Sequence, residues 1–310
     1  MEKVRTAAAV YYLLQGIGVV GWWMMLVFWP GTRGYFQLEA DSQTSLLAFW
    51  LPDLAFAAIG SVATAFLIYL RNRYETAAMW LVTGAVSYAA VYTFTFAAAT
   101  DRGWVGVVMM FPAMIWSGVF AAAITVGNGM FRRAKAASSG YVVFKTFAQI
   151  VLVWGLILFV LPYLITVVED KIGIPRLEFA FQKPIAAVIF VLLSSIGIYA
   201  AIVMSRVGKG TPLPLDHATE LVVLGPYAYV RNPMAVSGVG QGLAVALFLG
   251  SPLVALYALM GSAIWQLIFR PLEEDDLAAR FGPPYEEYRD AVKCWTPRRV
   301  KFGRAGFRNK

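Results

Sequence analysis

The chain has little charge. Only 14% of its 310 residues are Asp, Glu, Lys or Arg, whereas a typical soluble domain has about 25%. Hydrophobic residues make up 59% of the sequence and aromatic residues 15%. A soluble fold would expose much of this apolar surface to water. The composition therefore excludes an ordinary soluble domain and indicates a membrane protein.

Cysteine and histidine are almost absent. The one cysteine, Cys294, excludes an internal disulfide and a cysteine-rich metal site. The one histidine, His217, argues against a histidine-based metal centre, since such sites usually need several nitrogen or sulfur ligands. No metal site is predicted, and non-haem iron hydroxylases and desaturases are excluded. Cys294 is interpreted as a packed side chain and His217 as incidental.

Long apolar runs recur along almost the whole chain. About 20 helical residues cross a bilayer core of roughly 30 Å, and the backbone must be helical there because lipid offers it no hydrogen-bond partners. About eight spans are predicted, approximately at Ala7–Trp29, Leu47–Tyr69, Met79–Ala99, Val105–Val126, Phe147–Val168, Ile185–Val207, Met234–Leu249 and Leu253–Phe269. The predicted fold is therefore all-α and polytopic, with the last two, short spans forming a hairpin and amphipathic cytosolic helices following it.

The basic residues obey the positive-inside rule if both termini are cytoplasmic, as an even number of spans requires. The segments then predicted inside hold Lys3, Arg5, Arg71, Arg73, Arg132, Arg133, Lys135, Lys145, Arg206, Lys209, Arg231 and a basic tail from Arg270 to Lys310. The outside segments hold only Arg33, Arg102, Lys171, Arg176 and Lys183. An integral multi-pass protein is predicted, whose net charge of +8 favours contact with anionic lipid rather than nucleic acid.

The basic stretch "FRRAKAASSGYVVFK" after the fourth span predicts a boundary between two regions. Residues 1–145 hold four spans of unknown role, and residues 146–310 hold the polar motifs. In the first region, Asp53 lies near the outer end of a span beside Trp50 and Pro52. It is interpreted as an interfacial carboxylate.

Two polar stretches flank the predicted hairpin. The first, "GPYAYVRNP", places Tyr227, Arg231 and Asn232 just before the seventh span. The second, "RPLEEDDLAARFGPPYEEYRDAV", follows the eighth span. Because a hairpin returns its two ends to one membrane surface, the two stretches are expected to meet at the cytosolic rim.

The second stretch carries acidic and aromatic groups. Pro271 is expected to begin a new helix at the membrane surface, with Glu273 and Glu274 in its first turn, where carboxylates are favoured. Gln266 and Arg270 are four residues apart and share a helix face. A last helix is expected to present on one face Tyr285, Tyr288, Arg289 and Val292.

An arginine, an amide, two carboxylates and several tyrosines at one rim suit a zwitterionic or nucleoside-like ligand. A guanidinium binds a carboxylate or phosphate, glutamates bind an ammonium or ribose hydroxyls, and aromatic rings pack on adenine. A simpler interpretation is that the charges anchor the hairpin at the head groups, with Arg231 paired to Glu273 or Glu274. The spacing alone leaves both interpretations open.

The same residues resemble a family pattern. The integral-membrane methyltransferases related to isoprenylcysteine carboxyl methyltransferase and the phospholipid N-methyltransferases carry G-P-Y-x-x-x-R-[HN]-P, a hairpin, and then E-E-x-x-L-x-x-x-F-G-x-x-Y-x-x-Y. The matching residues are Gly225, Pro226, Tyr227, Arg231, Asn232, Pro233, Glu273, Glu274, Leu277, Phe281, Gly282, Tyr285 and Tyr288. The resemblance covers roughly residues 185–300. Asn232 stands where many members have histidine, which implies an acceptor other than a prenylated cysteine if this position faces the acceptor.

The resemblance implies S-adenosylmethionine as cofactor, bound from the cytosol, and an amphiphilic or lipid acceptor that is O- or N-methylated. It implies catalytic roles for Arg231 and Glu274. The residues implied in cofactor binding are Tyr227, Arg231, Asn232, Pro233, Glu273, Glu274, Leu277, Tyr285 and Tyr288. Two alternatives stay open: an NADPH-dependent membrane reductase of the sterol type, and a non-catalytic membrane protein that retains the fold. The lack of an extra basic cluster for a 2′-phosphate argues against the reductase.

Overall fold

The computed structural model describes residues 1–127, 144, 148, 150–208 and 220–303. The boundary predicted between residues 145 and 146, and His217, lie outside the described residues. Within the described residues every regular element is a helix, which confirms the all-α prediction.

Seven helices are long and apolar enough to cross a membrane, by length and composition, in the described part of the chain. They are Glu2–Phe28, Thr44–Tyr69, Glu75–Thr100, Trp104–Val126, Val151–Ile172, Gln182–Val207 and Pro252–Phe281. Pro233–Leu249 is a shorter apolar helix. Together they match the eight predicted runs, and the protein is an integral membrane protein.

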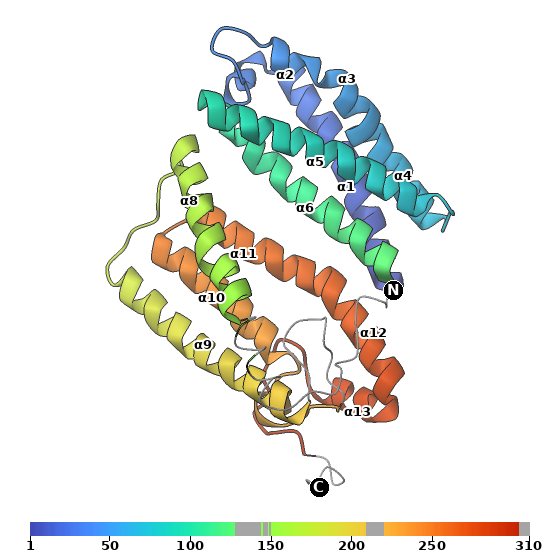
Figure 1. Cartoon of the computed structure of the whole chain (residues 1–310), viewed down its shortest axis with the longest axis vertical. Helices are drawn as coiled ribbons and strands as arrows, with labels where there is room; N and C mark the ends of the chain where they lie inside the picture. The colour runs from blue at the N-terminus through green and yellow to red at the C-terminus, as the bar shows by residue number, and fades with distance from the viewer. Residues whose placement is uncertain (128–143, 145–147, 149, 209–219, 304–310) are drawn as a thin grey trace. The chain divides into compact units, whose positions relative to one another are not determined.

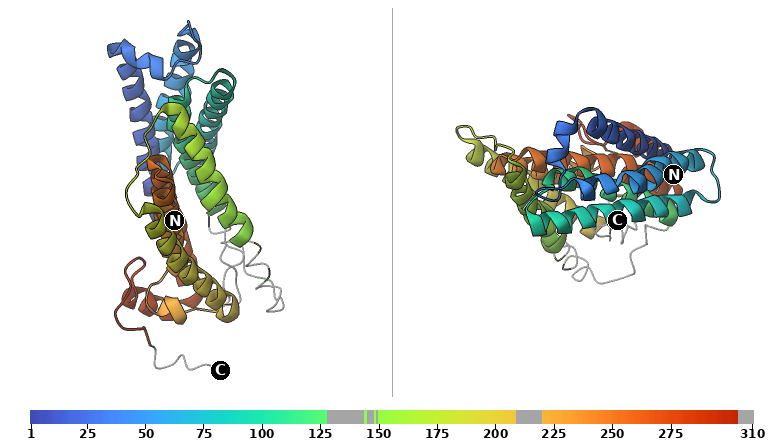
Figure 2. Two further views of the ribbon diagram at one scale, coloured as in Figure 1. Left: turned by 90° about the vertical axis from the view of Figure 1, so that its left-hand side faces the viewer. Right: turned by 90° about the horizontal axis from the view of Figure 1, so that it is seen from above.

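Two compact units make up the chain, and the first comprises Met1–Gly127 with Asp170–Gly173. Four helices run side by side in it, as Figures 1 and 2 show from three directions. Their bounds are α1 Glu2–Phe28, α4 Gly60–Tyr69, α5 Glu75–Thr100 and α6 Trp104–Val126. Between α1 and α4 lie the short elements η1 Pro30–Tyr35, α2 Thr44–Ala48, α3 Trp50–Pro52 and the π-helical η2 Asp53–Ile59.

Two ion pairs close one end of this unit. Arg5 Nη1 contacts Glu75 Oε2 at 2.7 Å, and Arg71 Nη2 contacts Glu2 Oε2 at 2.6 Å. The first turn of α1 therefore lies beside the turn between α4 and α5. The topology predicted from charge places both segments on the cytosolic side.

The second unit comprises the described residues of Asn128–Glu169 and Ile174–Lys310. Its elements are η4 Ile150–Trp154, η5 Leu156–Val160, α8 Leu161–Ile172, α9 Gln182–Val207, η6 Gly225–Ala228, α10 Pro233–Leu249, α11 Pro252–Ile264, η7 Trp265–Phe269, α12 Arg270–Phe281 and α13 Pro283–Ala291. Helix α10 packs along α9 on one side and α11 on the other (Figure 1). Helices α10 and α11 form the predicted hairpin.

The hairpin turn depends on Gly250. Its φ of +65° is in the left-handed region that favours glycine. Ser251 caps α11, because its Oγ accepts a hydrogen bond from the backbone N–H of Val254 at 3.0 Å, and Pro252 follows. The Gly250 carbonyl also accepts a hydrogen bond from the Leu177 N–H at 2.8 Å, which ties the turn to the segment before α9.

Replacing Gly250 with alanine is expected to destabilise the second unit by about 2 kcal/mol, from the left-handed backbone and a backbone clash. The new Cβ would lie 2.3 Å from the Leu177 carbonyl oxygen. Unfolding of purified protein in mixed micelles measures the change. Gly261→Ala is the matched control, because nothing lies within 4 Å of a Cβ at Gly261. Equal stability of the two variants would contradict the role assigned to the turn.

The structure refines the expectation for Pro271. Helix α12 begins at Arg270, but it follows η7 with no non-helical residue between, so helical residues run unbroken from Pro252 to Phe281. A proline inside a helix removes a donor and crowds the carbonyl of the preceding turn. The carbonyl that such a ring would crowd, four residues earlier, is that of Leu267, which lies in the wider π turn of η7. Glu273 and Glu274 are therefore held on the extension of a membrane helix.

Candidate functional site

The loop before α10 brings the first motif to the end of the hairpin. Gly225 has a φ of +57° and begins the short helix η6. Asn232 caps α10: its Oδ1 accepts a hydrogen bond from the Ala235 N–H at 3.2 Å, and Pro233 occupies the first turn. The cap fixes the amide of Asn232, whose Nδ2 lies 3.4 Å from Glu273 Oε2.

Arg231 joins three parts of the chain. Its Nη2 donates to Glu274 Oε1 at 2.7 Å, and its Nη1 donates to the Arg289 carbonyl at 3.1 Å. Its backbone N–H donates to the Lys293 carbonyl at 2.9 Å. The side chain is only 9% exposed, so water screens the ion pair weakly. Two motifs that are far apart in sequence therefore meet, as the hairpin argument predicts.

Glu274 is shared by two arginines. Its Oε1 also accepts a hydrogen bond from Arg270 Nε at 2.8 Å, one helical turn earlier. Arg270 Nη1 donates in turn to Gln266 Oε1 at 3.1 Å, which confirms the predicted face. Trp295 Nε1 donates to the same Gln266 oxygen at 2.8 Å. Two guanidinium groups therefore bind the one carboxylate of Glu274.

The tyrosines of the second motif are in the interior. Tyr285, Tyr288 and Val292 form one buried cluster with Val223, as the predicted helix face requires. Leu277 packs against this cluster. Arg289 contributes its carbonyl to Arg231 rather than its side chain. Helix α13 is therefore packed against the segment that carries the first motif.

Residues 293–302 run alongside residues 228–231. Besides the bond from Arg231 to Lys293, the Arg298 N–H donates to the Tyr229 carbonyl at 2.9 Å, and the Phe302 N–H donates to the Ala228 carbonyl at 2.8 Å. Cys294 on this segment is buried, and burial raises the pKa of its thiol. No spacing in the sequence predicts this pairing, because the segment belongs to neither motif.

Two buried phenol groups lack partners. The hydroxyls of Tyr227 and Tyr285 have no hydrogen-bond partner in the described part of the chain. Tyr288, in contrast, donates to the Tyr227 carbonyl at 2.7 Å. Burial raises the pKa of both Tyr227 and Tyr285, and the neighbouring carboxylates Glu273 and Glu274 add to the effect. Both hydroxyls therefore stay protonated at neutral pH and remain able to donate.

A cavity of about 350 Å³ opens next to the first motif. It is bounded by η4, η5, α9 and α10. Met234, which directly follows the Asn232-Pro233 cap, lines the cavity and also packs against the cluster that contains Tyr227. Polar groups in the wall are bonded to one another: Trp154 Nε1 donates to Gln241 Oε1 at 3.1 Å, and Gln241 Nε2 donates to Ser194 Oγ at 2.7 Å. The remaining wall is mainly apolar.

A comparison with known families tests the resemblance to the membrane methyltransferases. Residues 183–283 match the phospholipid methyltransferase family model. The matched segment runs from the first turn of α9 to the start of α13, and it contains Tyr227, Arg231, Glu273 and Glu274. Searches of curated proteins and of solved structures returned no significant match. The resemblance inferred from the two motifs is confirmed, and it supports a membrane methyltransferase.

The matched segment holds seven of the nine residues predicted for the site, and Tyr285 and Tyr288 follow it. Tyr227, Arg231, Asn232, Pro233, Glu273 and Glu274 surround the junction of α10 and α12, and Leu277, Tyr285 and Tyr288 form the packed layer beside it. Sequence reasoning missed Trp295 and the carbonyls of Arg289 and Lys293. Two of these three are backbone carbonyls, which every residue type has, so the sequence does not indicate them.

Proposed function

We propose that the protein is an S-adenosylmethionine-dependent methyltransferase that methylates a lipid or amphiphilic acceptor at the cytosolic face of the membrane. The observation that supports it most directly is the Arg231–Glu274–Arg270 cluster within the segment that matches the phospholipid methyltransferase family. The two orphaned hydroxyls of Tyr227 and Tyr285 beside this cluster are the kind of buried donor that a polar ligand satisfies.

The residues present suit the cofactor. S-adenosylmethionine supplies an electrophilic methyl group on a sulfonium, and it also carries a carboxylate, an ammonium and ribose hydroxyls. Glu274 provides negative charge for the ammonium or the sulfonium. Burial raises the pKa of Glu273 to about 7, so this carboxyl is partly protonated at neutral pH, and a bound cation would favour its charged form. The hydroxyls of Tyr227 and Tyr285 provide donors for oxygen atoms. Arg231 is already bonded to Glu274 and Arg289, so in this proposal it holds Glu274 in place and adds positive charge near the carboxylate.

The cavity beside Met234 is the proposed place for the acceptor. It lies among helices of the second unit and its wall is mostly apolar, as an acyl chain requires. It begins next to the cap of α10, where the first motif ends. Methyl transfer is a direct displacement, so the protein has chiefly to hold the two reactants in line and exclude water.

Purified full-length protein, incubated with methyl-labelled S-adenosylmethionine and total membrane lipid extract, tests the proposal. We expect label in the lipid fraction and saturable cofactor binding by calorimetry. Binding of NADPH in place of S-adenosylmethionine would favour the reductase, and binding of neither would favour a non-catalytic protein.

A pair of tyrosine variants separates ligand contact from packing. Tyr285→Phe removes a hydroxyl with no partner in the described chain, so we expect unchanged or slightly higher stability. We also expect about fivefold weaker cofactor binding, because the variant loses one proposed hydrogen bond to the cofactor. Tyr288→Phe removes the bond to the Tyr227 carbonyl, so we expect a stability loss of about 1 kcal/mol. Calorimetry and unfolding of both variants give the comparison. A Tyr285→Phe variant that binds the cofactor normally would exclude this contact.

A further inference from the structure

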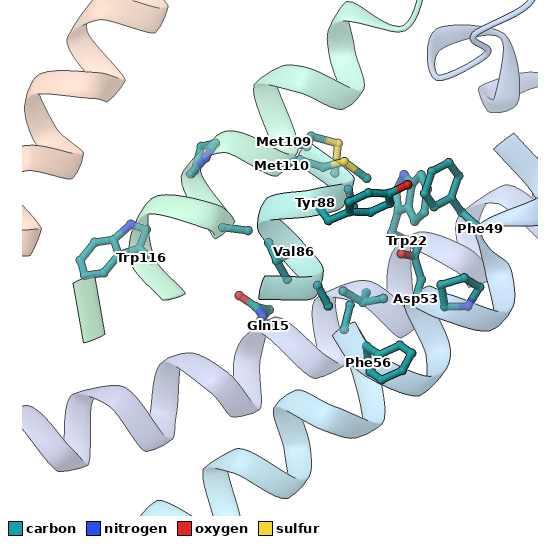
Figure 3. A pocket seen from close by; sticks show the side chains of 18 of the residues that line it. Gln15, Trp22, Phe49, Asp53, Phe56, Val86, Tyr88, Met109, Met110 and Trp116 are labelled. Atoms are coloured by element: carbon teal, nitrogen blue, oxygen red, sulfur yellow. The ribbon is translucent and has the colours of Figure 1, made fainter. Parts of the chain in front are cut away.

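A second pocket lies in the first unit, outside the segment that matches the methyltransferase family. Its volume is about 840 Å³, within the range of ligand pockets, which is roughly 300–1,000 Å³. Side chains of α1, η2, α5 and α6 form most of its wall. Figure 3 shows aromatic and methionine side chains around it, among them Trp22, Phe49, Phe56, Tyr88, Met109, Met110 and Trp116. Among the described residues that line it there is no lysine, arginine or histidine.

One carboxylate faces this apolar pocket. Asp53 lines the wall and is only 8% exposed, so protein side chains enclose it, which the interpretation made from the sequence did not include. Its Oδ2 accepts a hydrogen bond from Trp23 Nε1 at 3.1 Å, and no donor reaches Oδ1 from the described part of the chain. An ionised carboxylate with a single neutral donor is costly to bury unless a cation joins it.

Two further observations mark the same end of the pocket. The indole nitrogen of Trp22 is buried with no hydrogen-bond partner in the residues that the structure describes. Figure 3 shows Trp22, Asp53 and Phe49 at one end, with Trp116 at the other. Asp53 also begins the π-helical stretch Asp53–Ile59, and π turns within helices are frequent at functional sites.

The amide of Gln15, which also lines the wall, is already satisfied. Its Nε2 donates to Ser61 Oγ at 3.0 Å, and its Oε1 accepts from Ser117 Oγ at 3.0 Å and from the Tyr11 hydroxyl. This network joins α1, α4 and α6 and requires nothing from a ligand. Among the buried polar side-chain atoms of the described wall, Trp22 Nε1 has no hydrogen-bond partner, and Asp53 has a single donor.

We propose that this pocket binds a lipophilic amine, whose ammonium pairs with Asp53 and whose apolar chain lies along the aromatic wall toward Trp116. An oxygen atom beside the amine of such a ligand would also satisfy Trp22. The residues of this pocket belong to the first unit and those of the proposed methyltransferase site to the second, and the binding test below requires no methyl transfer.

Binding of hexadecylamine to the full-length protein in phosphatidylcholine nanodiscs tests the proposal, with empty nanodiscs as the blank. Hexadecanol and hexadecanoic acid, which have the same chain length, are the comparison probes. We expect saturable binding of the amine, weaker binding of the alcohol and least of the acid. Equal, non-saturable uptake of all three would mean that ordinary lipid fills the pocket, and would overturn the proposal.

Two pairs of variants assign the binding to this pocket. Asp53→Asn keeps an acceptor for Trp23 and is expected to bind hexadecylamine about tenfold more weakly, whereas the exposed Asp41→Asn binds as the wild type. Gly84 lines the pocket, and a Cβ added there would meet nothing within 4 Å, so Gly84→Leu is expected to fill part of the space and abolish binding. Gly21→Leu, equally open but outside the lining, is its control. Unchanged binding in both Asp53→Asn and Gly84→Leu would overturn the proposal.

Discussion

Replacing Glu274 with glutamine is expected to lower methyl transfer by about 100-fold, which corresponds to losing charge-assisted hydrogen bonds of about 2–3 kcal/mol. The glutamine keeps the shape of the side chain and one acceptor oxygen, but it removes the negative charge shared by Arg231 and Arg270. Two neighbouring guanidinium groups then repel each other, and the cofactor's positive groups lose one of their proposed counter-charges. Transfer of labelled methyl to membrane lipid measures the effect.

Glu286→Gln is the matched control for this variant, because Glu286 is exposed on α13. We expect its activity to equal that of the wild type. Cofactor binding by calorimetry and unfolding of both variants show whether a lost activity reflects the site or a lost fold. Wild-type activity in Glu274→Gln would remove this carboxylate from the proposed site.

Replacing Arg231 with alanine is expected to lower the free energy of unfolding by about 3 kcal/mol, since it leaves a partly buried carboxylate without one of its two cations. The variant also loses the hydrogen bond to the Arg289 carbonyl, and with it one link between α10 and α13. Arg231→Lys keeps the positive charge but lacks the guanidinium, which donates through two nitrogen atoms. We therefore expect its stability to lie between that of the wild type and that of Arg231→Ala. Unfolding in mixed micelles measures all three proteins.

The control for Arg231 is Arg299→Ala, which removes an exposed arginine from the neighbouring segment. A loss of stability no larger than that of this control would contradict the linking role of Arg231. Arg231→Ala is also expected to bind S-adenosylmethionine poorly, because Glu274 loses its fixed position. Normal binding in this variant would mean that the cofactor does not depend on the cluster.

The membrane architecture could be predicted from the sequence because the bilayer fixes the length and composition of a span. The apolar runs and the Gly250–Pro252 turn identify the helices and the hairpin without reference to any partner segment. The unbroken helix through Pro271 could not be predicted, since proline usually ends a helix and only the π turn of η7 shows how it is tolerated here. The sequence of the first unit also contains no periodic pattern that indicates a pocket.

The parts of the candidate site that are formed by side chains could be predicted from the sequence. The convergence of Arg231 with Glu274 followed from hairpin geometry, and the shared face of Tyr285, Tyr288 and Val292 followed from helical spacing. The sequence did not distinguish Glu273 from Glu274 as the partner of Arg231. It also did not show that Asp53 is buried, because its burial depends on α1, α5 and α6, which pack around it only in three dimensions.

The backbone pairing of residues 293–302 with residues 228–231 has a consequence for synthesis. Every membrane helix leaves the ribosome before this segment, yet the loop that holds Arg231 has its backbone partner only once Lys293 has been made. Domains tend to form in order as the chain emerges, so we expect the hairpin to insert before the segment that holds Arg231 gains its contacts with residues 289–293. A product of premature termination before Lys293 would hold the helices α1 to α13 and still lack the backbone partner of Arg231, so we expect it to be inactive in the proposed reaction.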